Sequence, residues 1–333
     1  MSSSNVSITE ASTIRQNTII FVQVWCYLMI SLGTIGHTCS VYVFTRPTLR
    51  SNSCTWYFLA ASMSGAGVVL INIPLRLLQA GYAINIYTNS LIACKVITFI
   101  QQWTRAQYAW FTALACVDRF LCSSSSATLR AYSSLHSASR TIPVTSLLVG
   151  IALFHIPVYF QINMRQQTCV PMSGIYQTFF GVWNLVIFSV GPPLVMLCFG
   201  LRTVQHIRGS IQRTGATNVA VRTENQRRKT TDRQLIQMMF VQCVIFMLTA
   251  SLPSVQFIYT SVRSSLVIDD LQSAKDNLFY NVCGFVSLTV PCLSFYLFTL
   301  SSKLFRCELM KLFNSKWRSQ QITVTSTSLK RRN

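Results

Sequence analysis

Acidic residues are scarce in this sequence. Only 8 of the 333 residues are Asp or Glu, and charged residues of both signs make up 11% of the chain. A soluble domain carries about 25% charged residues, so this composition cannot supply a water-facing surface. The 28 Lys and Arg give a formal net charge of +20, but they lie between apolar segments instead of forming a soluble basic face. The composition therefore argues against nucleic acid as a partner and predicts a membrane protein.

Clusters of catalytic or metal-binding residues are also lacking. The 4 His lie in separate segments, and the 12 Cys show no zinc-type pairs. Most of these cysteines are expected to be small hydrophobic residues within helices. An intramembrane hydrolase would need paired carboxylates, a Ser–His pair or a His cluster, and the sequence offers none of them. We therefore expect no metal, no cofactor and no enzymatic activity.

The first 18 residues form a polar segment. A cleaved signal peptide would need a basic start followed directly by an apolar run, and this segment has neither. Its serine and threonine content is equally typical of a disordered arm. Asn5-Val6-Ser7 is an N-glycosylation sequon, so glycosylation at Asn5 is expected if the arm is extracellular.

Seven stretches are apolar and long enough to cross a bilayer, which takes roughly 20 helical residues. They cover residues 19–45, 55–79, 93–123, 141–162, 176–202, 233–259 and 277–300. Internal prolines do not exclude these spans, because membrane helices tolerate them. The predicted fold is an all-α membrane protein, a seven-transmembrane helix bundle. Its predicted parts are an extracellular arm (1–18), the bundle (19–300) and a cytoplasmic tail (301–333).

The distribution of basic residues predicts the orientation of the bundle. Most Lys and Arg lie in the odd-numbered connections between the spans and in the C-terminal tail. Basic residues favour the cytoplasmic side of a membrane. The N-terminus is therefore predicted to be extracellular and the C-terminus cytoplasmic, in a multi-pass protein of the plasma membrane.

The third predicted span carries a distinctive set of residues. It begins at Cys94 and ends with Asp118-Arg119-Phe120, and Cys169 follows in the second outside connection. This pattern resembles the rhodopsin-like (class A) G-protein-coupled receptors, which have an Asp-Arg-Tyr motif 25 residues after a disulfide cysteine. The resemblance implies a bridge between Cys94 and Cys169, which can persist where both face an oxidising compartment. It also implies that Asp118, Arg119 and Phe120 form the switch that couples the receptor to a G protein.

The resemblance extends through most of the chain. Pro193 and Pro253 resemble the family's prolines in the fifth and sixth spans, where they are expected to act as helix pivots. Gly36-His37 resembles a Gly-Asn pair, and residues 294–298 resemble a degenerate Asn-Pro-x-x-Tyr motif. Residues 302–313 have the amphipathic pattern of a short helix on the membrane surface.

Several family residues are replaced. The second span has no Asp, Ser294 stands where an Asn is usual, and no tryptophan precedes Pro253. The polar cluster that would bind sodium is therefore expected to be missing. We expect weaker restraints on the resting state and raised basal activity.

The expected ligand pocket lacks a carboxylate. Gln101 lies seven residues after Cys94, where amine receptors of this family carry an aspartate, so a cationic amine would have no counter-ion. Arg105 lies one turn deeper, and Arg76 lies near the end of the second span. Either Arg105, helped by Arg76, binds an anionic or carbonyl-rich ligand, or Arg105 donates to helix carbonyls, Gln102 or buried water. A peptide-like ligand is favoured over an amine.

The resemblance is nearest to receptors of the invertebrate neuropeptide type, and the function it implies is transmission of an extracellular signal to a heterotrimeric G protein. Basic residues beside the spans also predict attraction to anionic membrane lipids. A transporter or channel is the alternative. It would predict duplicated halves or acidic residues along a pore, and we find neither in the sequence.

Overall fold

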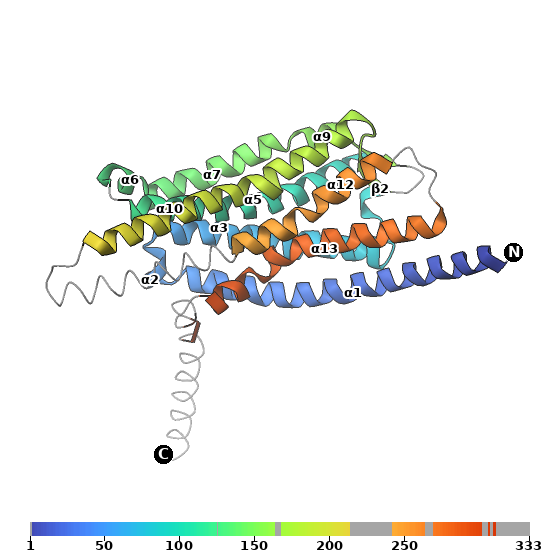
Figure 1. Cartoon of the computed structure of the whole chain (residues 1–333), viewed down its shortest axis with the longest axis horizontal. Coiled ribbons are helices and arrows are strands. Elements are labelled where there is room, and N and C mark those ends of the chain that lie inside the picture. Colours follow the sequence, from blue (N-terminus) through green and yellow to red (C-terminus); the bar gives the residue numbers. More distant parts are fainter. Residues whose placement is uncertain are drawn as a thin grey trace, which may run out of the picture.

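The computed structural model describes residues 2–124, 126–163, 168–213, 242–263, 269–301, 306 and 309–310. Within these ranges the chain is a bundle of long helices that run roughly along one axis (Figure 1). The predicted amphipathic helix at 302–313, the connection after the fifth span and the start of the sixth span at 233–241 lie wholly or mostly outside the described residues.

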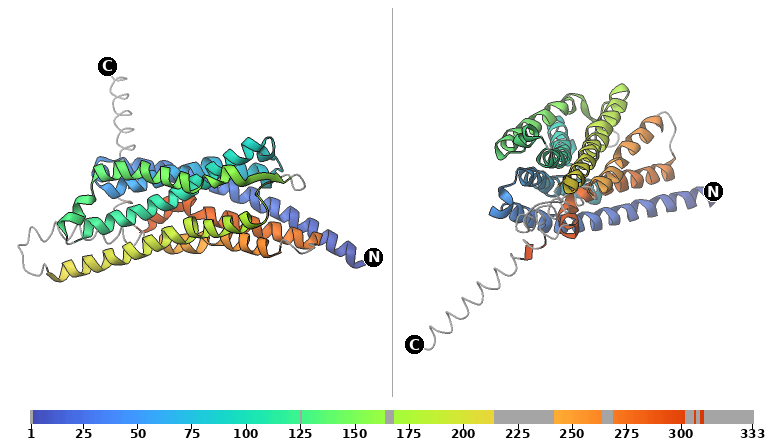
Figure 2. Two further views of the ribbon diagram at one scale, coloured as in Figure 1. Left: turned by 90° about the horizontal axis from the view of Figure 1, so that it is seen from above. Right: turned by 60° about the vertical axis from the view of Figure 1, so that its left-hand side comes forward.

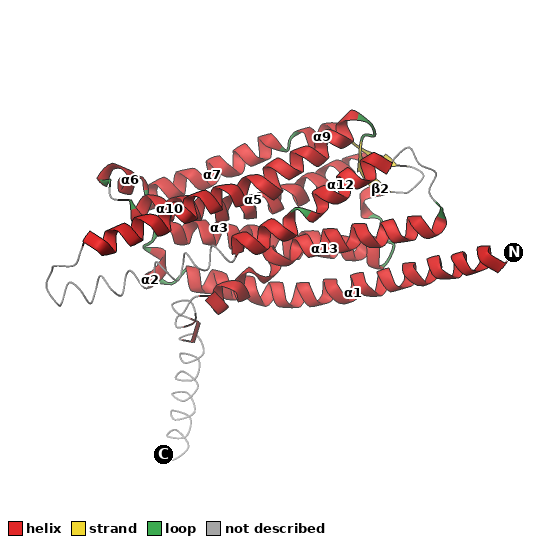
Figure 3. Cartoon of the chain, viewed as in Figure 1, coloured by secondary structure: helices red, strands yellow, loops and turns green. Residues whose placement is uncertain are grey.

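Helices account for nearly all of the described elements (Figure 3). The α-helices are α1 (Ser2–Phe44), α2 (Pro47–Arg50), α3 (Ser53–Gly67), α4 (Ile73–Arg76), α5 (Leu91–Ser123), α6 (Ala127–Tyr132), α7 (Leu135–Ala152), α8 (His155–Tyr159), α9 (Ile175–Asn184), α10 (Gly191–Arg213), α12 (Leu252–Arg263) and α13 (Asp270–Ser301). Residues 242–250 are helical as well and precede α12. The π-helices are η1 (Val68–Asn72), η2 (Leu77–Gly81) and η4 (Leu185–Val190), and η3 (Ile86–Thr88) is a 3₁₀ turn. One hairpin joins β1 (Phe160–Asn163) to β2 (Thr168–Pro171).

Six helical runs within the described residues are long and apolar enough to cross a membrane. They are Ser7–Phe44, Ser53–Gly81, Leu135–Tyr159, Ile175–Thr203, Gln242–Thr260 and Asp270–Leu297. The third predicted span lies in α5, a helix of 33 residues that is not among the six. Lys95, Arg105, Asp118 and Arg119 all lie on α5 and make it more polar. The chain is thus an all-α, multi-pass membrane protein.

The outer surface of the bundle is apolar. On α7, Leu147 is 64% exposed and Ile151 is 62% exposed, and Leu248 is 67% exposed in the helical run before α12. A soluble protein rarely leaves large apolar surfaces open to water. In a bilayer these side chains contact lipid tails instead, so the exposed surface agrees with the membrane assignment.

Helix α5 occupies the centre of the bundle. It packs against α3, α7 and α10, while α1 packs along α13 and α3. Figure 2 shows the bundle from two further directions. Because α5 is surrounded by other helices, its polar side chains are shielded from lipid.

The N-terminal segment differs from a disordered arm. Helix α1 runs without a break from Ser2 to Phe44, and its first part extends past α13 (Figure 1). The hydroxyls of Thr13 and Thr18 donate to carbonyls one turn earlier, at 2.9 and 2.7 Å. Ion pairs from Arg15 and Glu10 to α13 attach this part of α1 to the bundle. The expectation of a disordered arm, based on the serine and threonine content, was wrong because these hydroxyls bond to carbonyls of the helix itself.

The fourth predicted span, 141–162, has different boundaries in the structure. Helix α7 starts earlier, at Leu135, and ends at Ala152; a turn and the short helix α8 follow, and residues 160–162 belong to β1. Pro157 has no N–H to donate to the carbonyl of Leu153, which accepts from Ile156 at 3.0 Å instead. The missing donor accounts for the break, so the predicted span was too long at its end.

Candidate functional site

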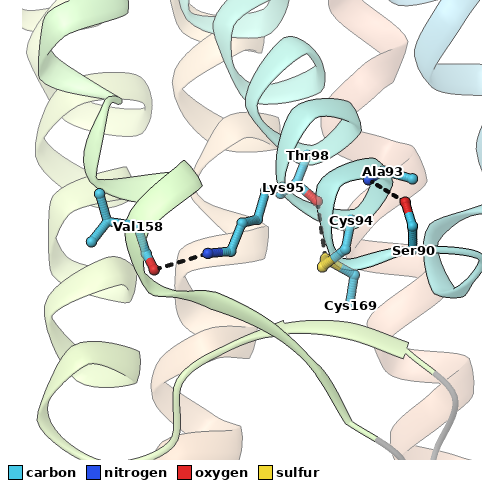
Figure 4. The surroundings of a disulfide bond; sticks show 7 residues. All are labelled: Ser90, Ala93, Cys94, Lys95, Thr98, Val158 and Cys169. Atoms are coloured by element: carbon cyan, nitrogen blue, oxygen red, sulfur yellow. Dashed lines mark hydrogen bonds between the residues drawn. A yellow bond between two sulfur atoms is a disulfide. The ribbon is translucent and has the colours of Figure 1, made fainter.

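The predicted disulfide is present at one end of α5. Cys94 and Cys169 are bridged, with 5.5 Å between their Cα atoms (Figure 4). The bridge ties strand β2 to the first turns of α5, and Thr98 contacts the sulfur of Cys169 at 3.4 Å. The hairpin formed by β1 and β2 therefore lies across this end of the bundle, which we call the disulfide end.

A cavity of about 1080 Å³ lies inside the disulfide end. Residues from α1, α4, α5, α9, α12, α13 and the β1–β2 hairpin line it. The three predicted pocket residues, Gln101, Arg105 and Arg76, all line it, as does the predicted pivot Pro253. The structure therefore brings together residues that the sequence places on the second, third and sixth spans.

Uncharged amide side chains dominate the polar wall of the cavity. Nine lining residues are Asn or Gln: Asn72, Gln79, Gln101, Gln102, Gln161, Asn163, Gln177, Gln256 and Asn277. Sequence reasoning identified only Gln101 and Gln102 among them. A signal for others was available, because polar residues recur at helical spacing on several spans: 72, 76 and 79; 98, 101, 102 and 105; 256 and 260.

Gln101 forms part of a hydrogen-bonded group at the cavity wall. Its Nε2 donates to the hydroxyl of Tyr87 at 2.6 Å, and its backbone carbonyl accepts from Asn72 at 3.2 Å. Burial raises the pKa of the Tyr87 hydroxyl to about 12, so the phenol is neutral at physiological pH. Gln101 is therefore held in place by uncharged groups. A site for a cationic amine would need a carboxylate at this position.

Arg105 projects into the floor of the cavity. It donates to the hydroxyl of Ser287 at 3.1 Å, and its guanidinium carbon lies 4.7 Å from the centre of the Phe188 ring. Its Nε is buried and has no hydrogen-bond partner among the described residues. Among the described residues, its hydrogen-bond partner is thus a side-chain hydroxyl and not a helix carbonyl or Gln102, while the third expected partner, buried water, stays a prediction.

Arg76 lines the same cavity as Arg105. Its guanidinium carbon lies 4.8 Å from the ring centre of Tyr280 and 5.4 Å from that of Phe285. Gly284 makes this position possible, because a Cβ there would lie only 2.2 Å from Nη2 of Arg76. Two like charges thus line one cavity, and both guanidinium groups rest against aromatic rings.

The acidic residues at this end are engaged elsewhere. Asp276 is the one acidic residue among those lining the cavity; it forms an ion pair with Arg263 at 3.6 Å and accepts from Tyr259 at 3.1 Å. Asp270 pairs with Arg15, and Glu10 with Lys275 at 3.8 Å. Among the residues that the structure describes, no carboxylate forms an ion pair with Arg76 or Arg105.

A packed layer lies below the cavity. Tyr108, Phe111, Phe246 and Val290 are all buried and belong to one apolar cluster. Gln242 donates to the hydroxyl of Tyr108 at 2.6 Å inside this layer. The layer separates the cavity from the opposite end of α5, where Asp118 and Arg119 lie.

Asp118 and Arg119 are both buried, at 5% and 7% exposure. The carboxylate of Asp118 accepts from Ser53 at 2.8 Å and from Ser133 at 3.0 Å, and these two hydroxyls lie 3.0 Å apart. Phe120 packs against Phe199 and His206 of α10, with ring centres 5.3 and 5.1 Å apart. Sequence reasoning missed Ser53 and Ser133, because serines in loops and helix starts are too common to single out.

The predicted pivots lie at interruptions in their helices. Pro192 and Pro193 have no N–H, and the preceding turn is the π-helix η4, in which the N–H of Gly191 bonds to Val186. Gly191 is required here, since a Cβ would lie 2.5 Å from the carbonyl oxygen of Val186. The indole of Trp110 donates to the neighbouring carbonyl of Ile187 at 3.0 Å. This irregular turn of the fifth span is therefore supported from α5.

The second predicted pivot, Pro253, is also hydrogen-bonded to a neighbouring helix at its interruption. The helix is interrupted at Ser251, just before Pro253. Across this interruption, Ser189 donates to the carbonyl of Ala250 at 2.6 Å and contacts Ser254 at 3.1 Å. The two predicted pivots are thus joined by one buried serine.

Asn5, the predicted glycosylation site, lies near the start of α1, and its side chain is outside the described part of the chain. In comparisons with known proteins, no protein-family model matches the sequence, and no curated protein matches it.

Proposed function

We propose that this chain is a seven-helix receptor of the rhodopsin-like type that passes an extracellular signal to a heterotrimeric G protein. In this proposal α5 is a seventh span, the disulfide end faces outward and the Asp118 end faces the cytoplasm. The N-terminus is then extracellular and the plasma membrane is the location.

One observation carries the proposal. A single central helix lines a large polar cavity at one end, with Gln101 and Arg105, and holds the buried Asp118–Arg119 pair at the other. Charged groups at membrane depth are costly, so their presence points to a role in function. A ligand that shifts α5 at the cavity would shift both groups together.

The proposed mechanism is a shift between two conformations of the helix bundle. A ligand favours whichever conformation binds it more tightly, and only this difference in affinity shifts the population. The interruption at Pro253 borders the cavity, and Ser189 joins it to the interruption at Pro193. We propose that motion there separates the helices and exposes Arg119 to the G protein.

The packed layer favours a receptor over a transporter or channel. Buried Tyr108, Phe246 and Val290 lie between the cavity and Asp118, so the cavity is closed at its floor by apolar packing. A transporter would have to open this layer in each cycle, whereas a receptor needs only to repack it.

Basal nucleotide exchange tests the proposal without a known agonist. The full chain is reconstituted in lipid nanodiscs with G proteins of each major class. The rate at which GTP binds to the G-protein α subunit is then measured. We expect exchange above empty nanodiscs with at least one class, and a loss of about tenfold or more in Arg119→Ala, as expected for removal of a charge-assisted contact.

Arg140→Ala is the matched control, because Arg140 is an exposed arginine of α7. Its exchange rate should equal that of the wild type. Absence of exchange with every class, or equal rates in wild type and Arg119→Ala, would reject the receptor. Solute or ion flux through proteoliposomes would support the transporter or channel instead.

A further inference from the structure

Arg76 and Arg105 line the cavity, and its one acidic lining residue among those described, Asp276, pairs with Arg263 instead. Given the proposed receptor function, on which this step rests, we infer that the ligand is peptide-like and carries a free carboxylate that Arg76 and Arg105 bind together. The other polar residues of the cavity then bind the amide groups of the ligand.

The acidic residues described at the disulfide end have partners other than Arg76 and Arg105. The described acids at the disulfide end are paired with Arg263, Arg15 and Lys275, and Asp269 caps the start of α13 by accepting from the N–H of Asp270 at 2.8 Å. The neighbouring segments outside the described residues, 164–167 and 264–268, contain no Asp or Glu. Among the described residues, therefore, no carboxylate at this end forms an ion pair with Arg76 or Arg105.

The two guanidinium groups are held ready for an anion. Phe188 and Tyr280 support them through ring faces, which do not occupy their N–H groups. Ser287 occupies one donor of Arg105, and its buried Nε has no partner among the described residues. A guanidinium is always charged and fits a carboxylate through two parallel hydrogen bonds. A shared carboxylate would also remove the repulsion between the two cations.

The cavity wall indicates the rest of the ligand. Nine amide side chains line it, and each offers both a donor and an acceptor. Peptide groups also carry one donor and one acceptor each, so an amide-rich wall matches a peptide backbone. The ordinary anion of such a ligand is a carboxylate, either at its C-terminus or on an acidic side chain.

Affinity selection tests this chemistry. The purified full chain in phosphatidylcholine nanodiscs is incubated with three random tetrapeptide libraries, and retained peptides are identified by mass spectrometry. The first library has no Asp or Glu and ends in a free acid; the second has the same sequences with a C-terminal amide. The third is amidated but contains one Glu, so it separates a side-chain carboxylate from a C-terminal one.

We expect the free-acid library, or the Glu-containing library, to be retained at least tenfold more than the uncharged amide library. Arg105→Gln and Arg76→Gln should each abolish this preference. Gly284→Ala should weaken it without changing any charge, because the new Cβ displaces the guanidinium of Arg76. The unfolding temperature of each variant shows whether it is folded.

Two matched controls should keep the preference. Lys95→Gln removes a positive charge from the same helix, but Lys95 donates to the carbonyl of Val158 and does not line the cavity (Figure 4). Gly200→Ala adds a methyl group to a helix where nothing lies within 4 Å of the new Cβ.

Equal retention of acids and amides, a preference that survives both Arg→Gln variants, or retention of no library would overturn the inference. These outcomes are separate from failure of the receptor proposal. Binding is measured without a G protein, and the exchange assay depends on Arg119 and not on the cavity.

Discussion

The two ends of α5 bury charge in opposite ways. At the Asp118 end, two serines from other elements donate to the carboxylate of Asp118, so this charge is satisfied within the chain. At the disulfide end, Arg76 and Arg105 line a large cavity, and no carboxylate of the described residues forms an ion pair with either of them. Buried charge that is satisfied internally stabilises a fold. Buried charge that is left unsatisfied destabilises it, and such a site is explained best by a ligand.

The disulfide should have the largest effect on this comparison, because it holds the hairpin over the cavity. Cys94→Ser should lower the free energy of unfolding by about 4 kcal/mol, as expected for a closed loop of this size, where the bridged residues are 75 positions apart. Denaturant unfolding in detergent micelles measures the change. Cys198→Ser is the control, since Cys198 is an exposed free cysteine. An equal stability of Cys94→Ser and wild type would mean that the bridge does not hold this end together.

Removing the satisfied charge should destabilise the protein. Asp118→Ala leaves Ser53 and Ser133 without their shared acceptor, and hydrogen bonds to a charged group contribute about 1.5–3 kcal/mol each. We expect a loss of about 3 kcal/mol in the same unfolding measurement. Ser139→Ala is the control, because Ser139 is exposed and donates only to a carbonyl of its own helix. If Asp118→Ala is as stable as the wild type, the two serine hydrogen bonds to Asp118 do not stabilise the fold.

Removing the unsatisfied charge of Arg105 should stabilise the protein instead. Without ligand, Arg105→Gln should raise the free energy of unfolding by about 1–2 kcal/mol, because an unpaired buried cation carries a desolvation cost. The Ser287 contact is lost or replaced by one from the amide. If Arg105→Gln destabilises the ligand-free protein as Asp118→Ala does, the two ends are alike and Arg105 is structural.

The ion pairs at the exposed start of α1 should matter least. Arg15 and Asp270 are 50% and 56% exposed, and exposed pairs contribute at most about 1 kcal/mol. Arg15→Gln should therefore change stability by less than about 1 kcal/mol, and the change should vanish in high salt. A larger loss that persists in high salt would show that α1 is anchored by something other than screened surface charge.

Much of the architecture followed from hydrophobic length and spacing alone. The apolar stretches predicted the spanning helices because a bilayer demands about 20 apolar residues in a helix, wherever those residues later pack. The pairing of Cys94 with Cys169 followed from a family resemblance, and the structure confirms it. The resemblance placed Gln101 in the ligand pocket, and the depth of Arg105 and Arg76 in their spans placed them beside it; the structure puts all three in one cavity.

Other features depend on contacts between residues distant in sequence. Ser53 and Ser133 hold Asp118, and Gly284 accommodates Arg76, yet a serine or glycine in an apolar sequence has no pattern that reveals its neighbour. Ion pairs to α13 likewise attach the start of α1, whereas the break at Pro157 has a local cause, a missing backbone donor. Sequence by itself determined which segments are apolar and which charges lie within them, because burial in lipid acts on each segment separately. Only the tertiary structure decided which charges are satisfied, because a hydrogen bond needs two groups within about 3 Å, and that distance is set by the packing of several helices at once.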